Sequence, residues 1–218
     1  MKAGEAFEII GNKLENNFKS LKFKYSKNNK WVKKSTKRFN YYIFMISFSE
    51  NIPDKDVGLQ VCFSVDDKTL PENSQQLFYI NLWKMGNSYN VATEVLLNNV
   101  YNDLLKKIEK YLIPFIEKFE EKISYYKDEW IEHGFLYPFN EFEFCTNLLF
   151  INSMYGRDSA KECLKRYLNT LDKNIQKIFK EHYFEKINEK PSFVFGPAFD
   201  KEINITIFLD ACRLKLIE

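Results

Sequence analysis

The sequence is poor in the residues that loosen a chain or that cross-link a small domain. It has 7 glycines and 6 prolines among 218 residues, which argues against a linker-rich or disordered chain. Its four cysteines stand singly, with no CxxC pair, at Cys62, Cys145, Cys163 and Cys212. This spacing favours reduced thiols in a buried core over a disulfide framework, and it indicates a cytosolic protein.

Long hydrophobic runs are also missing. No apolar stretch approaches the roughly 20 residues that a membrane-spanning helix needs. The first residues contain no apolar signal core. We therefore expect a soluble, cytoplasmic protein that does not associate with membranes.

Residues typical of catalysis are scarce. Neither histidine, His133 or His182, adjoins a recognisable nucleophile signature, and no glycine-rich phosphate loop is present. His182 lies one helical turn before Glu185, so the two side chains could bind one metal ion. This spacing more often belongs to a solvated helix face. The adjacent Asp66 and Asp67 could suggest a carboxylate pair for a hard metal ion, but neighbouring residues at a strand end point apart. Turns favour Asp, so we expect a loop there. We expect no catalytic residue, no metal and no cofactor.

Aromatic residues and unevenly placed charges are what the chain does have. Aromatic side chains make up 17% of it, enough to fill a core and to anchor an interface. The net charge is only +2, yet no acidic residue occurs from Asn16 to Ser49. That stretch predicts a basic N-terminal face, built from Lys19, Lys22, Lys24, Lys27, Lys30, Lys33, Lys34, Lys37 and Arg38.

The first half of the chain has the periodicity of one helix followed by strands. Apolar residues spaced by three and four predict a helix over 3–20. Alternating and β-branched or aromatic runs then predict a hairpin around the turn 26–29 and strands over 41–48, 57–65 and 77–83. The short connections between these runs indicate an antiparallel meander.

The second half has helical periodicity. A helix is predicted from Ala92 onward, capped by Asn90 or Ser88. Pro114 is expected to kink this helix or to split it in two, because proline lacks an N–H group.

Further helices are predicted over 141–155 and 159–187, the first ended by Gly156 and the second capped by Asp158 or Ser159. The two could form a helical hairpin. Residues 203–217 alternate in part like a strand, but we favour a terminal helix there. The sequence thus predicts an α+β fold: an N-terminal helix packed on an antiparallel meander sheet, followed by a C-terminal helical bundle. Residues 1–120 and 121–218 are the expected domains, unless the chain forms one continuous domain.

The basic hairpin is the strongest functional signal. Its aromatic residues interleave with lysines, and we expect the partner-binding residues to be Tyr25, Trp31, Lys33, Lys34 and Arg38. Lysines that neutralise phosphates and rings that stack on bases are the ingredients of single-strand nucleic-acid binding. The same residues could also bind an acidic protein, or could only protect a solvated sheet edge against aggregation.

Several segments resemble a large bacterial family of unknown function. They are the helix with Phe7, Ile10 and Leu14, the hairpin segments 23–25 and 31–34, the strand YYIFMISF at 41–48, the strand FYINL at 78–82 and the turn at 154–160. Members of that family look like a helix, a lysine-rich hairpin and a meander followed by helices. Some relatives resemble immunity proteins, which neutralise a toxin by binding it, and the resemblance implies no catalytic residues.

Three functional hypotheses follow. The leading one is a non-catalytic protein-binding protein, of the kind an immunity protein represents, whose partner is a toxin with an acidic surface. The second is a nucleic-acid-binding module that uses the hairpin around residues 19–38. The third is an enzyme whose site is assembled from residues distant in sequence, which local spacing cannot reveal.

Overall fold

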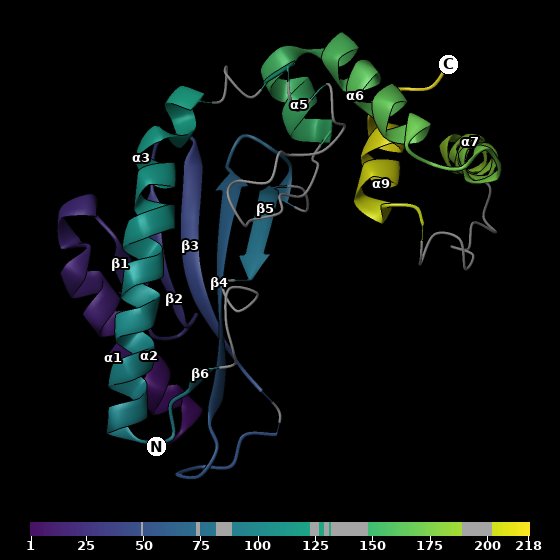
Figure 1. The fold of residues 1–218 in the computed structure, drawn as a ribbon. Coiled ribbons are helices and arrows are strands. Elements are labelled where there is room, and N and C mark those ends of the chain that lie inside the picture. Colours follow the sequence, from purple (N-terminus) through teal and green to yellow (C-terminus); the bar gives the residue numbers. More distant parts are fainter. Residues whose placement is uncertain are drawn as a thin grey trace. The chain divides into compact units, whose positions relative to one another are not determined.

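The computed structural model describes residues 1–48, 50–72, 75–81, 89–122, 127–128, 131, 148–188 and 202–218 (Figure 1). The chain divides into two compact units. The first combines Met1–Thr69 with Phe78–Ile123, and the second combines Leu70–Leu77 with Ser124–Glu218. The predicted α+β class is confirmed, since an N-terminal helix and an antiparallel sheet precede a set of C-terminal helices.

The sheet follows the predicted meander. Its strands lie in the order β1-β2-β3-β4-β5, and the short β6 pairs with β4. The pairs from β1 to β4 are antiparallel, as is the β4–β6 pair. The strands are β1 (Lys24–Ser26), β2 (Trp31–Ser35), β3 (Phe39–Ser47), β4 (Gly58–Asp67), β5 (Gln76–Asn81) and β6 (Tyr89–Asn90).

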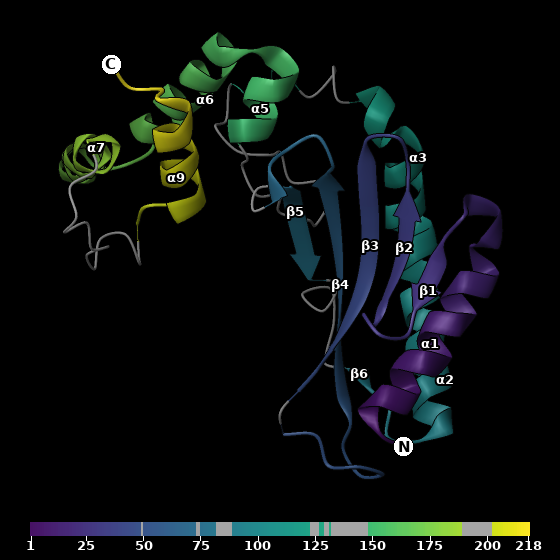
Figure 2. The same ribbon diagram turned by 180° about the vertical axis from the view of Figure 1, so that it is seen from behind.

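Helices pack on one face of this sheet (Figures 1 and 2). The helix α1 (Ala3–Asn17) contacts β1 and β2, and a 3₁₀ turn at Lys19–Leu21 leads from it toward the sheet. The helix α2 (Glu94–Lys107) is followed by a π-helical turn at Ile108–Leu112 and by α3 (Ile113–Lys122).

The start of α2 and its junction with α3 both bear on predictions. The N-cap of α2 is Thr93, whose side chain accepts a hydrogen bond from the Leu96 N–H. The prediction of Asn90 was wrong, because Asn90 belongs to β6, and Ser88 lies outside the described residues. The interruption expected at Pro114 takes the form of the preceding π-helical turn, whose wider backbone tolerates the missing N–H.

Aromatic rings fill the space between the sheet and α3. The Phe115 and Phe119 ring centroids lie 4.8 Å apart, and Phe119 meets the ring of Phe39 edge-on at 5.1 Å. Tyr41 and Phe63 add further edge-on contacts with these two phenylalanines. All five residues are buried, so part of the high aromatic content serves the core.

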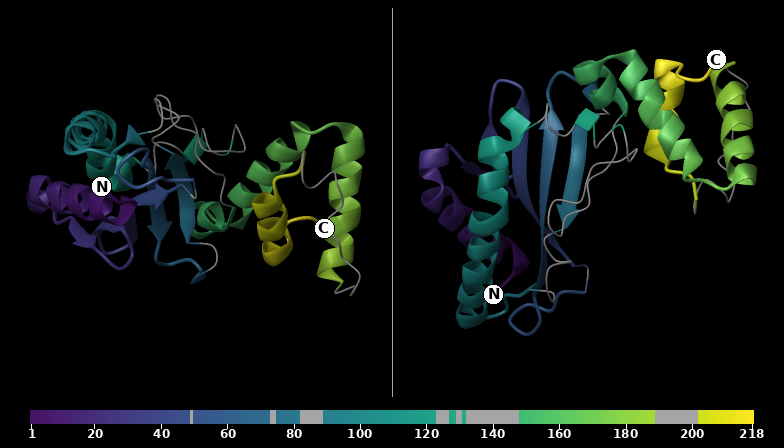
Figure 3. Two further views of the ribbon diagram at one scale, coloured as in Figure 1. Left: turned by 90° about the horizontal axis from the view of Figure 1, so that it is seen from below. Right: turned by 45° about the horizontal axis from the view of Figure 1, so that its top comes forward.

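The second unit contains α5 (Leu148–Tyr155), α6 (Arg157–Asn169), α7 (Lys173–Ile187) and α9 (Ile205–Leu214). The helices α5 and α6 form the predicted hairpin around Gly156, which has a φ of +90°. The predicted terminal helix is confirmed by α9, which packs against α5 and α7. Both views in Figure 3 show α7 and α9 side by side.

The single helix predicted over 159–187 was wrong. The chain breaks after Asn169, and Asp172 starts α7 by accepting a hydrogen bond from the Asn174 N–H. The first of the two helices begins at Arg157 with Gly156 as its N-cap, so neither expected cap is used. Of the helix predicted over 141–155, the part at 141–147 lies outside the described residues, as do the end of the strand predicted over 77–83 and Cys145.

Candidate binding surface of the basic hairpin

The alternation of β2 divides the predicted contact residues between two faces of the sheet. Tyr25 pairs with Val32 in the register, and its ring lies against Gly11 of α1. Lys34 pairs with Tyr41, whose ring contacts α3. Tyr25 and Lys34 therefore point to the helix-covered face. Trp31 and Lys33, one residue away in each direction from Val32, point to the opposite face.

Tyr25 is a packing residue in this arrangement. A methyl group built on Gly11 would lie 2.3 Å from two carbons of the Tyr25 ring, so the close approach requires glycine. The Tyr25 N–H donates to the Glu15 carboxylate at 3.2 Å. Burial raises the pKa of the Tyr25 hydroxyl, and the nearby Glu8 charge adds to this. Tyr25 thus holds the hairpin on α1.

The opposite face brings Trp31 and Lys33 together with an aromatic residue from β3. The Trp31 and Tyr42 ring centroids are 5.0 Å apart, and the Lys33 ammonium lies 5.1 Å from the Tyr42 ring centroid. Lys24 stands directly across from Lys33 in the β1–β2 register, so it shares this face. We call Lys24, Trp31, Lys33 and Tyr42 the hairpin face.

Lys24 and Lys33 form a like-charge pair on neighbouring strands. Like charges directly opposite each other destabilise a sheet. Neither lysine forms an ion pair with any residue that the structure describes. Lys33 also acts on Asp66 of β4: burial raises the pKa of the Asp66 carboxyl, and the charge of Lys33 partly offsets that rise.

Arg38, the fifth predicted contact residue, belongs to a buried ion pair. Its Nε and Nη2 donate to Asp67 Oδ2 at 2.9 and 2.6 Å. The Asp67 side chain is 0% exposed, and its other oxygen accepts from the Thr69 N–H and hydroxyl. The pair ties the β2–β3 turn to the end of β4.

The loop predicted at Asp66 and Asp67 was wrong, because both residues lie in β4. The expectation that they point apart is confirmed: Asp67 pairs with Phe39 on the helix-covered face, and Asp66 pairs with Asn40 on the other. Local sequence spacing could not predict the Arg38–Asp67 ion pair, because the two residues are 29 positions apart.

A second polar cluster that the sequence did not reveal joins β6 to α2. The Tyr89 hydroxyl donates to Asp103 at 3.0 Å and accepts from Lys107 at 2.9 Å, and Lys107 also pairs with Asp103. Burial raises the pKa of Tyr89. Burial opposes the rise in the pKa of Lys107, but hydrogen bonds to Tyr89 and Asp103 prevail. Both pKa values move further above neutral pH, so Tyr89 and Lys107 keep their protons there. The cluster therefore fits a structural clamp better than a general base or a nucleophile.

One buried carboxylate, in contrast, has a pKa that moves toward neutral pH. Asp210 of α9 is 2% exposed, and burial raises its pKa to about 6. The charge of Arg213 limits the rise, as do the N–H groups of Leu149 and Leu148, at the start of α5, which hydrogen-bond this carboxylate. Asp210 therefore caps α5 from another helix. It lines neither the hollow along α6 nor the groove between α6 and α7 that are described below.

The structure describes one of the two histidines and three of the four cysteines. His182 Nδ1 lies 3.2 Å from the Glu185 carboxylate, and within the described ranges no group of three or more His, Cys, Asp and Glu is placed to hold a metal ion. Cys62, Cys163 and Cys212 are buried thiols, as expected of core residues. His133 lies outside the described residues.

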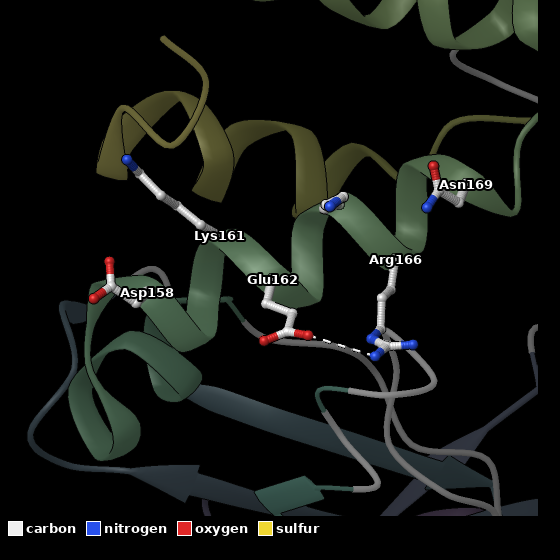
Figure 4. A pocket seen from close by; sticks show the side chains of 6 residues that line it. Asp158, Lys161, Glu162, Arg166 and Asn169 are labelled. Atoms are coloured by element: carbon white, nitrogen blue, oxygen red, sulfur yellow. Dashed lines mark hydrogen bonds and ion pairs between the residues drawn. The ribbon is translucent and has the colours of Figure 1, made fainter.

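A hollow along α6 is a further candidate site (Figure 4). Glu162 and Arg166 reach toward one another at 3.4 Å on one side of the helix, whereas Lys161 points away from them. These charged side chains are at least one-third exposed, so water screens them. The hollow has the character of a solvated helix face.

Comparisons with protein-family models, curated proteins and solved structures found no match for this chain. The resemblance to the bacterial family therefore stays a prediction that rests on the segments quoted for it. Among the described helices, none has both the length and the apolar character needed to cross a membrane.

Proposed function

We propose that the protein binds an acidic protein partner through the hairpin face and performs no catalysis. The observation that carries this proposal is the Lys24–Lys33 pair, two cations held opposite each other without an ion-pair partner in the described chain. Carboxylates from a partner would relieve that repulsion. The Trp31 ring beside them would supply the aromatic contact that anchors many protein interfaces.

The internal contacts of the hairpin favour a protein over a nucleic acid. Lys27 pairs with Glu8 at 2.8 Å, Lys30 lies over the Phe7 ring, and Arg38 is bound to Asp67. Nucleic-acid affinity grows with the number of cations available to phosphates. A hairpin that uses several of its cations internally, with a carboxylate near Lys33, suits a local acidic patch better than a phosphate backbone.

The absence of catalysis in this proposal rests on the clusters that the structure does describe. The Tyr89 group is clamped in protonation states unsuited to proton transfer at neutral pH. Neutralisation of a toxin is the role we propose for such binding, because some relatives in the bacterial family that the chain resembles look like immunity proteins. A toxin with an acidic surface is the partner that the charge of the hairpin face suits.

The test uses the full chain as bait in a lysate of its host, with and without nuclease treatment. Proteins retained by the wild type are identified, re-expressed and titrated by calorimetry against Lys24→Glu/Lys33→Glu. The matched control is Lys22→Glu/Lys37→Glu, which makes the same charge change at exposed positions off the hairpin face. We expect the first variant to weaken binding at least about tenfold and the control to bind within about threefold.

Three results would overturn the proposal. One is a partner that binds both double variants equally. Another is the recovery of no protein partner at all. A third is retention that disappears with nuclease treatment, which would favour the nucleic-acid alternative.

A further inference from the structure

The second unit contains a groove of its own between α6 and α7. The described residues that line its hollow of about 380 Å³ combine an apolar floor with a polar rim. Leu164, Leu168 and Leu216 are buried on the floor. The rim residues are Lys161, Lys165, Asn169, Gln176, Lys180 and Glu218.

The last residues of the sequence lie in this groove in the manner of a bound peptide. The Arg157 guanidinium donates to the Lys215 carbonyl at 2.6 Å. The Tyr183 hydroxyl both accepts from the Ile217 N–H at 3.1 Å and donates to the Ile217 carbonyl at 3.0 Å. These contacts go to the backbone, so they fix the path of this segment independently of its side chains.

Two side chains of this segment show the chemistry that the groove accepts. Leu216 is 5% exposed and lies on the apolar floor. Two residues further on, the Glu218 carboxylate pairs with Lys161. An apolar side chain followed two positions later by a carboxylate is thus the pattern that the groove already binds.

The remaining part of the groove offers the same chemistry with no occupant from the described chain. Lys165 of α6 and Lys180 of α7 are exposed, and neither forms an ion pair with a described residue. The other cations of these helices are largely taken, since Arg166 pairs with Glu162 and Lys177 with Glu181. Two uncompensated lysines beside buried Leu164 and Leu168 therefore attract a segment that is both acidic and apolar.

We propose that this groove binds an extended acidic peptide segment of a protein partner, with Lys165 and Lys180 pairing its carboxylates and Leu164 and Leu168 contacting its apolar side chains. The segment carries the apolar-x-acidic pattern of Leu216 to Glu218. This site belongs to a different compact unit from the hairpin face, so it does not rest on the function proposed above.

The test measures fluorescence anisotropy of a labelled peptide of Leu-Ser-Glu repeats, with Leu-Ser-Lys repeats as the comparison peptide. The full chain is titrated as the wild type and as Lys165→Glu/Lys180→Glu. The matched control is Arg166→Glu/Lys177→Glu, which makes the same charge change on the same helices away from this floor. We expect the groove variant to bind at least about tenfold more weakly and the control to stay within about threefold.

Two further variants sharpen the result. Glu218→Gln frees Lys161 and is expected to tighten peptide binding about threefold, a gain that general misfolding cannot produce. Lys24→Glu/Lys33→Glu should bind the peptide like the wild type, which separates this site from the hairpin face. The proposal is overturned if the lysine peptide binds equally well, if the groove and control variants behave alike, or if an oligothymidylate displaces the probe, which would indicate a general polyanion site.

Discussion

The role of Arg38 can be decided by removing its guanidinium group. The sequence places Arg38 among the partner-binding residues, whereas the structure shows its side chain bound to a carboxylate that is 0% exposed. In Arg38→Ala, the Asp67 carboxylate keeps only the two hydrogen bonds from Thr69. A buried charge that loses its counter-ion is strongly destabilising.

The expected size of the effect follows from the burial of the two partners. Removing one partner of a buried pair costs about 3–5 kcal/mol. The lower end applies, because the Arg38 side chain is 27% exposed and water can reach part of the site that it leaves. A loss of about 3 kcal/mol corresponds to a fall in Tm of roughly 6–12 °C for a chain of this size. Asp67→Asn should cost less, since Arg38 then turns to solvent.

The assay is thermal and urea unfolding followed by far-UV circular dichroism for both single variants and the double variant. We expect a coupling free energy of about 2 kcal/mol between the two positions. Lys37→Ala, which removes an exposed neighbouring cation, should change stability by less than about 0.5 kcal/mol. If Arg38→Ala proves as stable as Lys37→Ala but loses partner binding, the structural reading fails and Arg38 is a contact residue.

Three further predictions concern the cores of the two units. The pKa of Asp210 rises from 3.8 to about 6 on folding, so its contribution to stability is greatest below about pH 4 and is lost as the pH rises toward 6. In urea titrations, Asp210→Asn should therefore raise the free energy of unfolding by up to about 3 kcal/mol at pH 7 and change it little at pH 4. Gly11→Ala should destabilise by about 1 kcal/mol through its contact with Tyr25, but in a Tyr25→Ala background it should stabilise by about as much, and equal effects in both backgrounds would disprove the contact. Burial raises the pKa of Cys163 to about 12 and that of Cys212 to about 11, so peptide mapping should find neither thiol labelled by a maleimide at pH 7 without denaturant, and rapid labelling would contradict their burial.

Helix breaks illustrate where local pattern misleads. Leu164, Leu168, Leu171, Ile175 and Ile178 keep helical spacing across residues 169–173, so the apolar stripe predicts one helix. The chain nevertheless turns there. Asp172 was the available signal, because an Asp that can cap a following N–H favours a helix start. The apolar stripe outweighed that signal, although it records only which residues are buried and not where the axis changes direction.

The sequence by itself determined the order and type of most elements. The β-branched and aromatic run of β3, the alternation over β4 and the helical spacing over α1 and α2 are all local features of the sequence that follow from backbone geometry. It also placed the basic hairpin correctly as a hairpin.

Only the tertiary structure decided which hairpin residues act together. Pairing of strands sent Trp31 and Lys33 to one face and Tyr25 and Lys34 to the other, and folding bound Arg38 to Asp67. The groove of α6 and α7, with Leu216 on its floor, likewise joins segments far apart in the chain. Periodicity reports the burial of each residue, but contacts between distant segments depend on how the elements pack, and a single sequence does not state that packing.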